Sequence, residues 1–284
     1  MPELPEVETI KLGLQRKIIG LKIKNIEAVS ARSFLGNSSK LQGKIVLNVW
    51  RRAKILGIDL SDNLTLLFHL KMTGQLVLVK SKQRIMGGHP TPDMVGPLPN
   101  SHTRVIIEFS DKSKLFFNDQ RRFGWVKVSS KSEVISEKFL EKLGPEPLEK
   151  GFIWQVLKEN LLKHKSMSIK VAIMDQTVVA GVGNIYASEG CFNAKLDPSS
   201  KVKDLNDEQF KRLHKGIIKS LKDGLKYGGS TRAHFVDAEG HKGYFLDYAF
   251  VYGLDKHPCK ICGHIIQKMQ LGGRGTYFCS RCQK

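Results

Sequence analysis

The chain has 284 residues, and its 46 lysines and arginines outnumber 27 aspartates and glutamates, so its formal net charge is +19 at pH 7. Such an excess of positive charge repels itself in a folded protein and favours a polyanionic partner, with nucleic acid the first candidate and solubility alone the weaker interpretation. The basic residues are spread along the whole chain, which disfavours a membrane surface, and no apolar run approaches the ~18 residues that a membrane span requires.

The start of the chain predicts a helix and a cytoplasmic protein. The segment 1–8 is acidic and rich in proline, the opposite of a signal peptide. In the reducing cytoplasm we expect no disulfides among the five cysteines. An apolar stripe at helical spacing follows, and it is formed by Val7, Ile10, Leu14 and Ile18.

Pro2 is a candidate nucleophile, because it becomes the terminal residue once Met1 is removed. The pKa of a terminal α-amino group is about 8, against about 10.4 for lysine, so far more of it is neutral at pH 7. A neutral secondary amine can attack an aldehydic sugar carbon and form an iminium, and Glu3 and Glu6 stand beside it to move protons. Composition alone favours a plainer interpretation, in which these residues only start a helix.

A β-rich region follows the first helix. Its short apolar runs, separated by Gly, Asn, Asp and Ser, predict a β-sandwich or barrel. The segment Ser81–Ser101 holds four prolines and three glycines and is expected to be a long loop between strands. The expected strands are Leu21–Val29, Lys44–Trp50, Ile55–Leu60, Leu64–Leu70, Gln75–Val79, Arg104–Phe109, Lys114–Asn118 and Trp125–Val128.

A helical region is predicted from about Ser132 onward. Asn206 and Gln209 have the spacing of an N-cap and its capping box, and Gly228-Gly229 is expected to stop that helix. Between them an apolar face is formed by Phe210, Leu213, Ile217, Leu221 and Leu225.

The C-terminal region predicts a zinc site. Two cysteine pairs in the last 26 residues are sixteen residues apart, Cys259 with Cys262 and Cys279 with Cys282. This spacing is typical of a zinc ribbon, and a zinc ion held by four thiolates has no open position for substrate, so we expect one structural ion. Arg274 and Thr276 lie at the expected hairpin tip, where a glycine-flanked arginine can approach a phosphate. Cys191 stands alone and is expected to be a small buried apolar residue.

The fold class expected is therefore a multidomain α+β protein. Residues 1–130 would form an N-terminal β-sandwich with a leading helix, residues 131–248 a helical domain, and residues 249–284 the zinc ribbon.

Several motifs in the right order resemble formamidopyrimidine-DNA glycosylases from end to end. They are Pro2–Thr9, Asp119–Gly124, Gly144–Pro147, Asp175-Gln176 with Ala180–Tyr186, and the terminal cysteine ribbon. The resemblance implies a bifunctional DNA glycosylase and AP lyase of base excision repair. Such an enzyme removes 8-oxoguanine and formamidopyrimidines from duplex DNA and then cuts the strand by β,δ-elimination. It also implies a monomer with a helix–two-turn–helix DNA-binding domain.

The resemblance implies catalytic roles for five residues. Pro2 matches the nucleophile that forms the Schiff base, Glu3 the acid that protonates the sugar ring oxygen, and Glu6 a residue of the same patch. Lys54 matches the proton donor in β-elimination. Arg274 matches the arginine of the zinc hairpin that is linked to phosphate contact and δ-elimination.

The resemblance also implies DNA contacts. His102, Arg121 and Lys165 match DNA-contact positions, and Asn184 matches the phosphate contact of the helix–two-turn–helix motif. A buried base must flip out of the duplex at a cost of a few kcal/mol, and inserted side chains compensate for the lost stacking. The side chains that match this gap-filling set are Met72, Arg121 and Phe123.

Two alternatives remain open from the sequence. A related enzyme of the endonuclease VIII type shares the proline chemistry but prefers oxidised pyrimidines, although Leu4 and Arg121–Phe123 favour the purine enzyme. A non-catalytic zinc-ribbon DNA-binding protein would explain the charge and the cysteines but not Pro2 and Glu3. The segment Ser230–Gly243, expected to cover the lesion, offers no motif that fixes its contacts.

Overall fold

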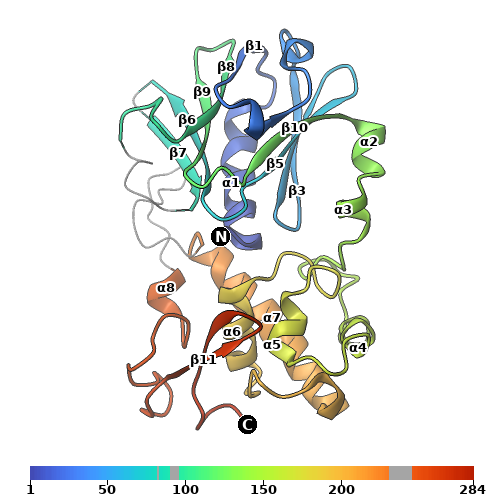
Figure 1. The fold of residues 1–284 in the computed structure, drawn as a ribbon, viewed down its shortest axis with the longest axis vertical. Coiled ribbons are helices and arrows are strands. Elements are labelled where there is room, and N and C mark those ends of the chain that lie inside the picture. Colours follow the sequence, from blue (N-terminus) through green and yellow to red (C-terminus); the bar gives the residue numbers. More distant parts are fainter. Residues whose placement is uncertain (82, 90–95, 230–244) are drawn as a thin grey trace. The chain divides into compact units, whose positions relative to one another are not determined.

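The computed structural model describes residues 1–81, 83–89, 96–229 and 245–284. These residues form two compact units, the first of residues 1–141 and the second of residues 142–229 and 245–284 (Figure 1). The division into three domains at 130 and 248 stays a prediction. In the second unit, the cysteine region shares an apolar cluster with Phe192 of the helical region. The segment 230–243, expected to cover the lesion, lies outside the described residues.

The first unit begins with helix α1, Leu4–Ile18, whose predicted apolar stripe is buried. Pro5 stands in the first turn, where its missing N–H would have no helical partner, and Glu6 lies near the positive end of the helix dipole. The backbone N–H of Glu3 donates to Glu6 Oε2 at 2.7 Å. The residues that form the candidate nucleophilic patch are therefore also the residues that start the helix.

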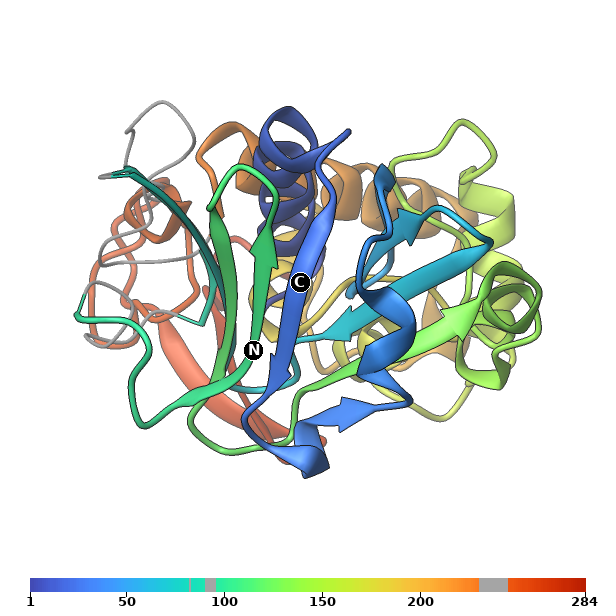
Figure 2. The same ribbon diagram turned by 90° about the horizontal axis from the view of Figure 1, so that it is seen from above.

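Two five-stranded sheets are formed by the described residues of this unit, with orders β1-β8-β9-β6-β7 and β2-β10-β5-β4-β3 (Figure 2). Neighbouring strands are antiparallel except β2 and β10, which are parallel. The strands are β1 Ile23–Ala28, β2 Phe34–Leu35, β3 Val46–Arg52, β4 Ile55–Leu60, β5 Leu64–His69, β6 Gly74–Lys80, β7 Gln83–Gly88, β8 Thr103–Phe109, β9 Lys114–Asp119 and β10 Trp125–Ser130. Two short 3-10 helices, η1 Ala31–Ser33 and η2 Ser38–Leu41, lie between β1 and β3.

The prediction that 81–101 is a loop without strands was wrong. Its residues Gln83–Gly88 form β7, which pairs with β6 as a hairpin at the edge of the sheet. This segment carries few apolar residues and ends in two glycines. It therefore forms a strand because it pairs with β6 more than because its residues favour strands. Gly88 is required there, because its φ is +121° and a Cβ would lie 2.4 Å from the carbonyl oxygen of Gly74.

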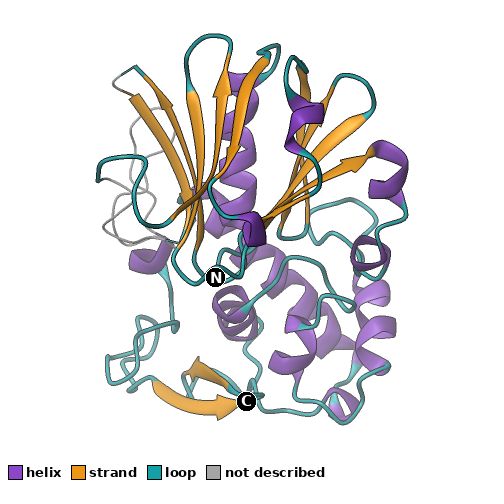
Figure 3. Ribbon diagram, turned by 45° about the horizontal axis from the view of Figure 1, so that its top comes forward, coloured by secondary structure: helices purple, strands orange, loops and turns teal. Residues whose placement is uncertain are grey.

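The two sheets face each other around a shared core, with α1 beside them (Figure 3). The core includes Ile10 of α1, Phe68 of β5 and Phe117 of β9. Helix α1 contacts β7 and β3, the last strand of each sheet, so it covers the side on which both sheets end. The predicted β-sandwich with a leading helix is confirmed, and helices α2 Lys131–Ile135 and α3 Lys138–Glu141 complete the unit.

The second unit is mainly helical. Asn206 Oδ1 accepts from Gln209 N and Gln209 Oε1 accepts from Asn206 N, each at 2.9 Å, which confirms the predicted capping box. The glycines after α7 have φ values of +70° and +96° and end the helix as predicted. The helices are α4 Trp154–Leu162, α5 Ile169–Met174, α6 Asn184–Asn193, η4 Val202–Asp204, α7 Asp207–Lys226 and α8 Phe245–Tyr248.

A β-hairpin of β11 Gln267–Leu271 and β12 Arg274–Phe278 completes this unit. Its two-residue turn consists of Gly272 and Gly273, with φ of +54° and +72°, which is the left-handed conformation that tight hairpins need. Among the residues that the structure describes, no helix has the length and apolar character of a membrane-crossing segment.

Candidate functional site

Pro2, Glu3 and Glu6 form a compact patch at the start of α1. Pro2 is buried, and both glutamates are only 2% exposed. The bond from the Glu3 N–H to Glu6 fixes the second carboxylate against the backbone of the first. Removal of Met1 would turn the Pro2 nitrogen into a secondary amine next to these two shielded carboxylates, which can accept and return protons with little competition from water.

Lys54 lies in the turn between β3 and β4 and is nearly buried. The turn is held toward α1 by Arg51, whose Nε donates to Glu8 Oε2 at 2.7 Å and whose guanidinium also donates to the Ala53 carbonyl at 3.1 Å. Ala53 has φ +53°, a strained value that directs the chain into the tight turn before Lys54. The Arg51-Arg52-Ala53-Lys54 motif thus links the start of α1 to the turn that carries Lys54.

His69, at the end of β5, belongs to the same region, although no sequence motif points to it. Burial, together with the positive charges of Lys71 and Lys54, lowers the pKa of His69 to about 3. Its Nδ1 accepts the backbone N–H of Lys71 at 3.0 Å, so the neutral ring carries its proton on Nε2. A lone histidine within an apolar run gives no sequence signal for such a position.

The predicted gap-filling side chains lie on two turns of the first unit. Met72 is half-buried in the turn between β5 and β6, whereas Arg121 and Phe123 lie in the turn between β9 and β10. Phe123 is 49% exposed, and the Arg121 guanidinium carbon lies 4.8 Å from the centre of its ring. An exposed aromatic ring stacked under a guanidinium is a flat surface that could take the place of a base.

His102, a predicted DNA contact, lies just before β8 and is half-buried. Its carbonyl oxygen accepts the backbone N–H of Asp119 at 2.9 Å, so it lies near the turn that carries Arg121 and Phe123. The first unit therefore brings together four of the predicted DNA-contacting residues.

In the second unit, Asn184 begins α6 and contacts the zinc hairpin. Its Nδ2 donates to the carbonyl oxygen of Gly275 at 3.0 Å, and its Oδ1 accepts a hydrogen bond from Nζ of the fully buried Lys170. Gly275 follows Arg274, which is exposed at the hairpin tip as predicted. No sequence pattern points to Lys170, because only the folded chain places it beside Asn184. Lys165 is exposed in the loop between α4 and α5.

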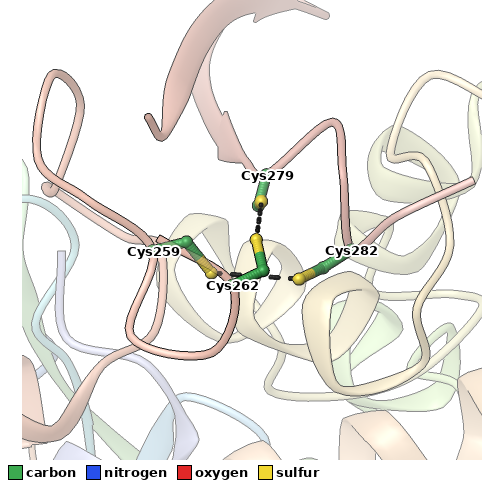
Figure 4. Close-up of side chains that lie close together, drawn as sticks. All are labelled: Cys259, Cys262, Cys279 and Cys282. Carbon is green, nitrogen blue, oxygen red and sulfur yellow. Dashed lines mark hydrogen bonds between the residues drawn. The ribbon is translucent and has the colours of Figure 1, made fainter. Parts of the chain in front are cut away.

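The four C-terminal cysteines converge as predicted, and Figure 4 shows their thiol groups pointing toward one another. All four sulfur atoms lie within 4.8 Å of one another, with Cys262–Cys279 at 3.5 Å and Cys259–Cys282 at 3.9 Å. Four sulfurs around one zinc ion at ~2.3 Å would be about 3.8 Å apart, so the cluster fits a tetrahedral ion. Cys191 is fully buried, and burial raises the pKa of its thiol to about 12, as expected for an inert residue.

Comparison with known proteins gives three consecutive matches. Residues 1–126 match the formamidopyrimidine-DNA glycosylase N-terminal domain, residues 143–236 the formamidopyrimidine-DNA glycosylase H2TH domain, and residues 256–284 the zinc finger found in FPG and IleRS. The formamidopyrimidine-DNA glycosylases of Ligilactobacillus salivarius and Rickettsia bellii are 37% and 38% identical to the chain. Both matches cover all of this chain and at least 99% of the relative.

Solved structures agree along the whole chain. A complex of a Lactococcus lactis FPG variant with DNA containing Fapy-dG has a TM-score of 0.87 at 33% identity, and the match covers 100% of both chains. A complex of MutM with DNA containing carbocyclic 8-oxo-G has a TM-score of 0.85 at 33% identity, with the same coverage.

Proposed function

This chain belongs to the formamidopyrimidine-DNA glycosylase family, and we propose that it excises oxidised purines through Pro2 and then cuts the strand. It is a DNA glycosylase of base excision repair that carries one structural zinc ion on Cys259, Cys262, Cys279 and Cys282. The observation that carries the proposal is the pair of nearly buried glutamates next to Pro2. A DNA-binding protein without catalytic activity would not need them.

In the proposed reaction the neutral nitrogen of Pro2 attacks C1′ of the damaged nucleotide. The N-glycosidic bond breaks, and its electron pair leaves with the base, which takes up a proton. Glu3 gives a proton to the ring oxygen as the C1′–O4′ bond opens, which leaves an iminium between the Pro2 nitrogen and C1′. Loss of a proton from C2′ then expels the 3′ phosphate, a second elimination expels the 5′ phosphate, and water releases the enzyme.

The other predicted residues support these steps. We assign Lys54 to proton transfer during the first elimination and Arg274 to a phosphate that becomes a leaving group. Glu6 holds the Glu3 backbone and stays in the proton-transfer patch. The neutral His69 beside Lys54 adds no second positive charge there.

The proposed DNA contacts divide into two groups. Met72, Arg121 and Phe123 would fill the gap after the nucleotide flips out, whereas phosphates would be held by His102, Lys165 and Asn184. The zinc ion keeps the hairpin folded, so its role is to position Arg274 rather than to react. We propose a monomer that acts on duplex DNA in the cytoplasm.

Borohydride trapping tests the proposal. Reduction of the iminium should cross-link the wild-type enzyme to duplexes that contain 8-oxoguanine, and Pro2→Gly or a blocked N-terminus should remove most of the cross-link. Undiminished trapping with a blocked N-terminus would assign the nucleophile to a lysine. Stronger trapping on an oxidised pyrimidine would favour the endonuclease VIII type, and no trapping on any lesion would favour a DNA-binding protein without catalytic activity.

A further inference from the structure

The fully buried carboxylate of Asp119, at the end of β9, connects the turns on which the gap-filling side chains lie. We propose that Asp119 is a positioning residue for lesion recognition, which holds Met72, Arg121 and Phe123 in the arrangement that distinguishes damaged from undamaged DNA. The inference rests on the proposed function, because it takes from it the role of these three side chains.

The side chain of Asp119 bridges the two turns directly. Its Oδ1 accepts hydrogen bonds from the Thr73 hydroxyl and, at 3.2 Å, from the backbone N–H of Arg121. Its Oδ2 accepts the backbone N–H of Gly124 at 2.6 Å. Thr73 Oγ1 in turn accepts the Arg121 N–H at 3.0 Å. One carboxylate therefore fixes both ends of the segment that contains Phe123, and it fixes the residue next to Met72.

The backbone of Asp119 extends the same network to a third segment. Its N–H donates to the carbonyl oxygen of His102 at 2.9 Å, and its own carbonyl oxygen accepts from Nε of Arg104 at 2.9 Å. Arg104 is nearly buried and also donates to the carbonyl oxygen of Ser101 at 2.9 Å. The turn that contains His102 is thus tied to the same aspartate.

The turn between β9 and β10 needs such an anchor. Arg122 has φ +58°, a conformation that an arginine adopts only when its surroundings enforce it. Gly124 has no room for a side chain, since a Cβ would lie 2.8 Å from the Phe117 ring and 2.9 Å from the His69 carbonyl oxygen. Phe123 between them is half-exposed, so burial alone constrains its ring only weakly. The hydrogen bonds of Asp119 therefore determine where the ring stands before DNA binds, and a preformed arrangement lowers the entropy cost of binding.

Four variants separate positioning from simple stabilisation. Asp119→Asn places an amide where the carboxylate accepts N–H bonds, and Thr73→Val removes one hydroxyl while keeping the shape of the side chain. Thr73→Ser keeps that hydroxyl and should retain the function. Asp111→Asn is the matched control, because Asp111 accepts two bonds from Ser113 in the turn between β8 and β9, at the opposite end of β9 from Asp119.

The measurement is the ratio of dissociation constants for undamaged duplex and for the same duplex with a tetrahydrofuran abasic analogue opposite cytosine. Thermal unfolding of each protein is recorded in parallel. We expect the ratio to fall about tenfold in Asp119→Asn and Thr73→Val, since one charge-assisted hydrogen bond is at stake. Thr73→Ser and Asp111→Asn should keep the wild-type ratio, although Asp111→Asn loses stability.

An unchanged ratio in Asp119→Asn and Thr73→Val would overturn the inference. An equal fall in Asp111→Asn would also overturn it, because a general loss of stability would then explain the result. So would an equal fall in Thr73→Ser, because that variant keeps the hydroxyl that binds Asp119. A wild-type enzyme that excises no damaged purine would instead contradict the proposed function. The ratio is a binding measurement, so in that case it would still decide the role of Asp119.

Discussion

Replacing Glu189 by glutamine should loosen the zinc-bearing region from α6. Glu189 is fully buried and accepts three backbone N–H groups, from Phe250 at 2.9 Å, Val251 at 2.9 Å and Tyr252 at 2.8 Å. Glutamine keeps the oxygen that serves Val251 and Tyr252 but places an NH2 group against the N–H of Phe250. A buried charge-assisted hydrogen bond contributes about 1.5–3 kcal/mol, and an unpaired donor costs about 1–3 kcal/mol more.

The desolvation of the carboxylate offsets part of this loss. Burial raises the pKa of Glu189, although the three backbone N–H groups act in the opposite direction, so the charged carboxylate is disfavoured. The neutral amide of glutamine avoids this cost of burying a charge. We therefore expect a loss of about 2 kcal/mol, a sizeable share of a typical stability of about 5–15 kcal/mol. Because these bonds hold the segment that leads to the cysteines, zinc loss to a chelator should also be faster.

Urea unfolding and the rate of zinc transfer to a chromogenic chelator measure the two effects. The matched control is Glu208→Gln in the first turn of α7, where the side chain is 71% exposed and lies 3.8 Å from Lys211. A surface pair of this kind contributes about 0.5 kcal/mol or less. If Glu189→Gln changed stability no more than Glu208→Gln, the structural role assigned to the three N–H bonds would be refuted.

Two further predictions concern zinc and pH. Cys259→Ser should remove the zinc ion, unfold the hairpin and weaken DNA binding, since structural zinc contributes on the order of 10 kcal/mol to folding. Metal analysis that finds one zinc ion per chain in the variant would contradict this prediction. The folded-state pKa of His69, about 3, lies below its unfolded value of about 6.5, so its contribution to stability is complete above pH 6.5 and is lost as the pH falls toward 3. His69→Gln should therefore lose less stability than the wild type between pH 6.5 and 4 in urea unfolding, and equal losses would show that His69 is not buried in its neutral form.

Local signals in the sequence were enough to predict much of the fold. The stripe of α1 and the capping box of α7 each depend on residues within a few positions of one another, and both are confirmed. The cysteine spacing and the glycine turn likewise predicted the zinc hairpin, because tight turns and tetrahedral zinc each restrict local geometry. The DNA-glycosylase family followed from the order of several such motifs.

Long-range contacts explain what the sequence left out. Strand β7 exists because β6 offers it a partner, and its own residues have little strand propensity. Thr73 and Asp119 are 46 positions apart, and Asn184 and Gly275 are 91 apart, so no spacing pattern could predict either hydrogen bond. The low pKa of His69 likewise depends on burial in the folded sandwich and on the nearby charges of Lys71 and Lys54. Sequence patterns therefore pointed to the proposed DNA contacts more readily than to the residues that hold them in place.

The last prediction is that Arg121 reads the base opposite the lesion. Its backbone is anchored to Thr73 and Asp119, while its guanidinium is exposed and lies over the Phe123 ring. A planar group with five donors can bond the edge of an orphaned base, and the ring below holds that plane in one orientation. Arg121→Ala should therefore weaken binding to lesion DNA and narrow the preference for cytosine over adenine opposite 8-oxoguanine.

Arg121→Lys separates base reading from phosphate binding. Lysine restores the charge but not the planar donor set, so we expect it to recover part of the affinity and little of the discrimination. Single-turnover excision opposite cytosine and opposite adenine, in the wild type and both variants, measures the discrimination directly. If Arg121 only neutralised a phosphate, both variants would keep the wild-type ratio of the two rates, and Arg121→Ala alone would flatten the dependence of binding on salt. A preserved ratio would therefore assign the choice of opposite base to another residue.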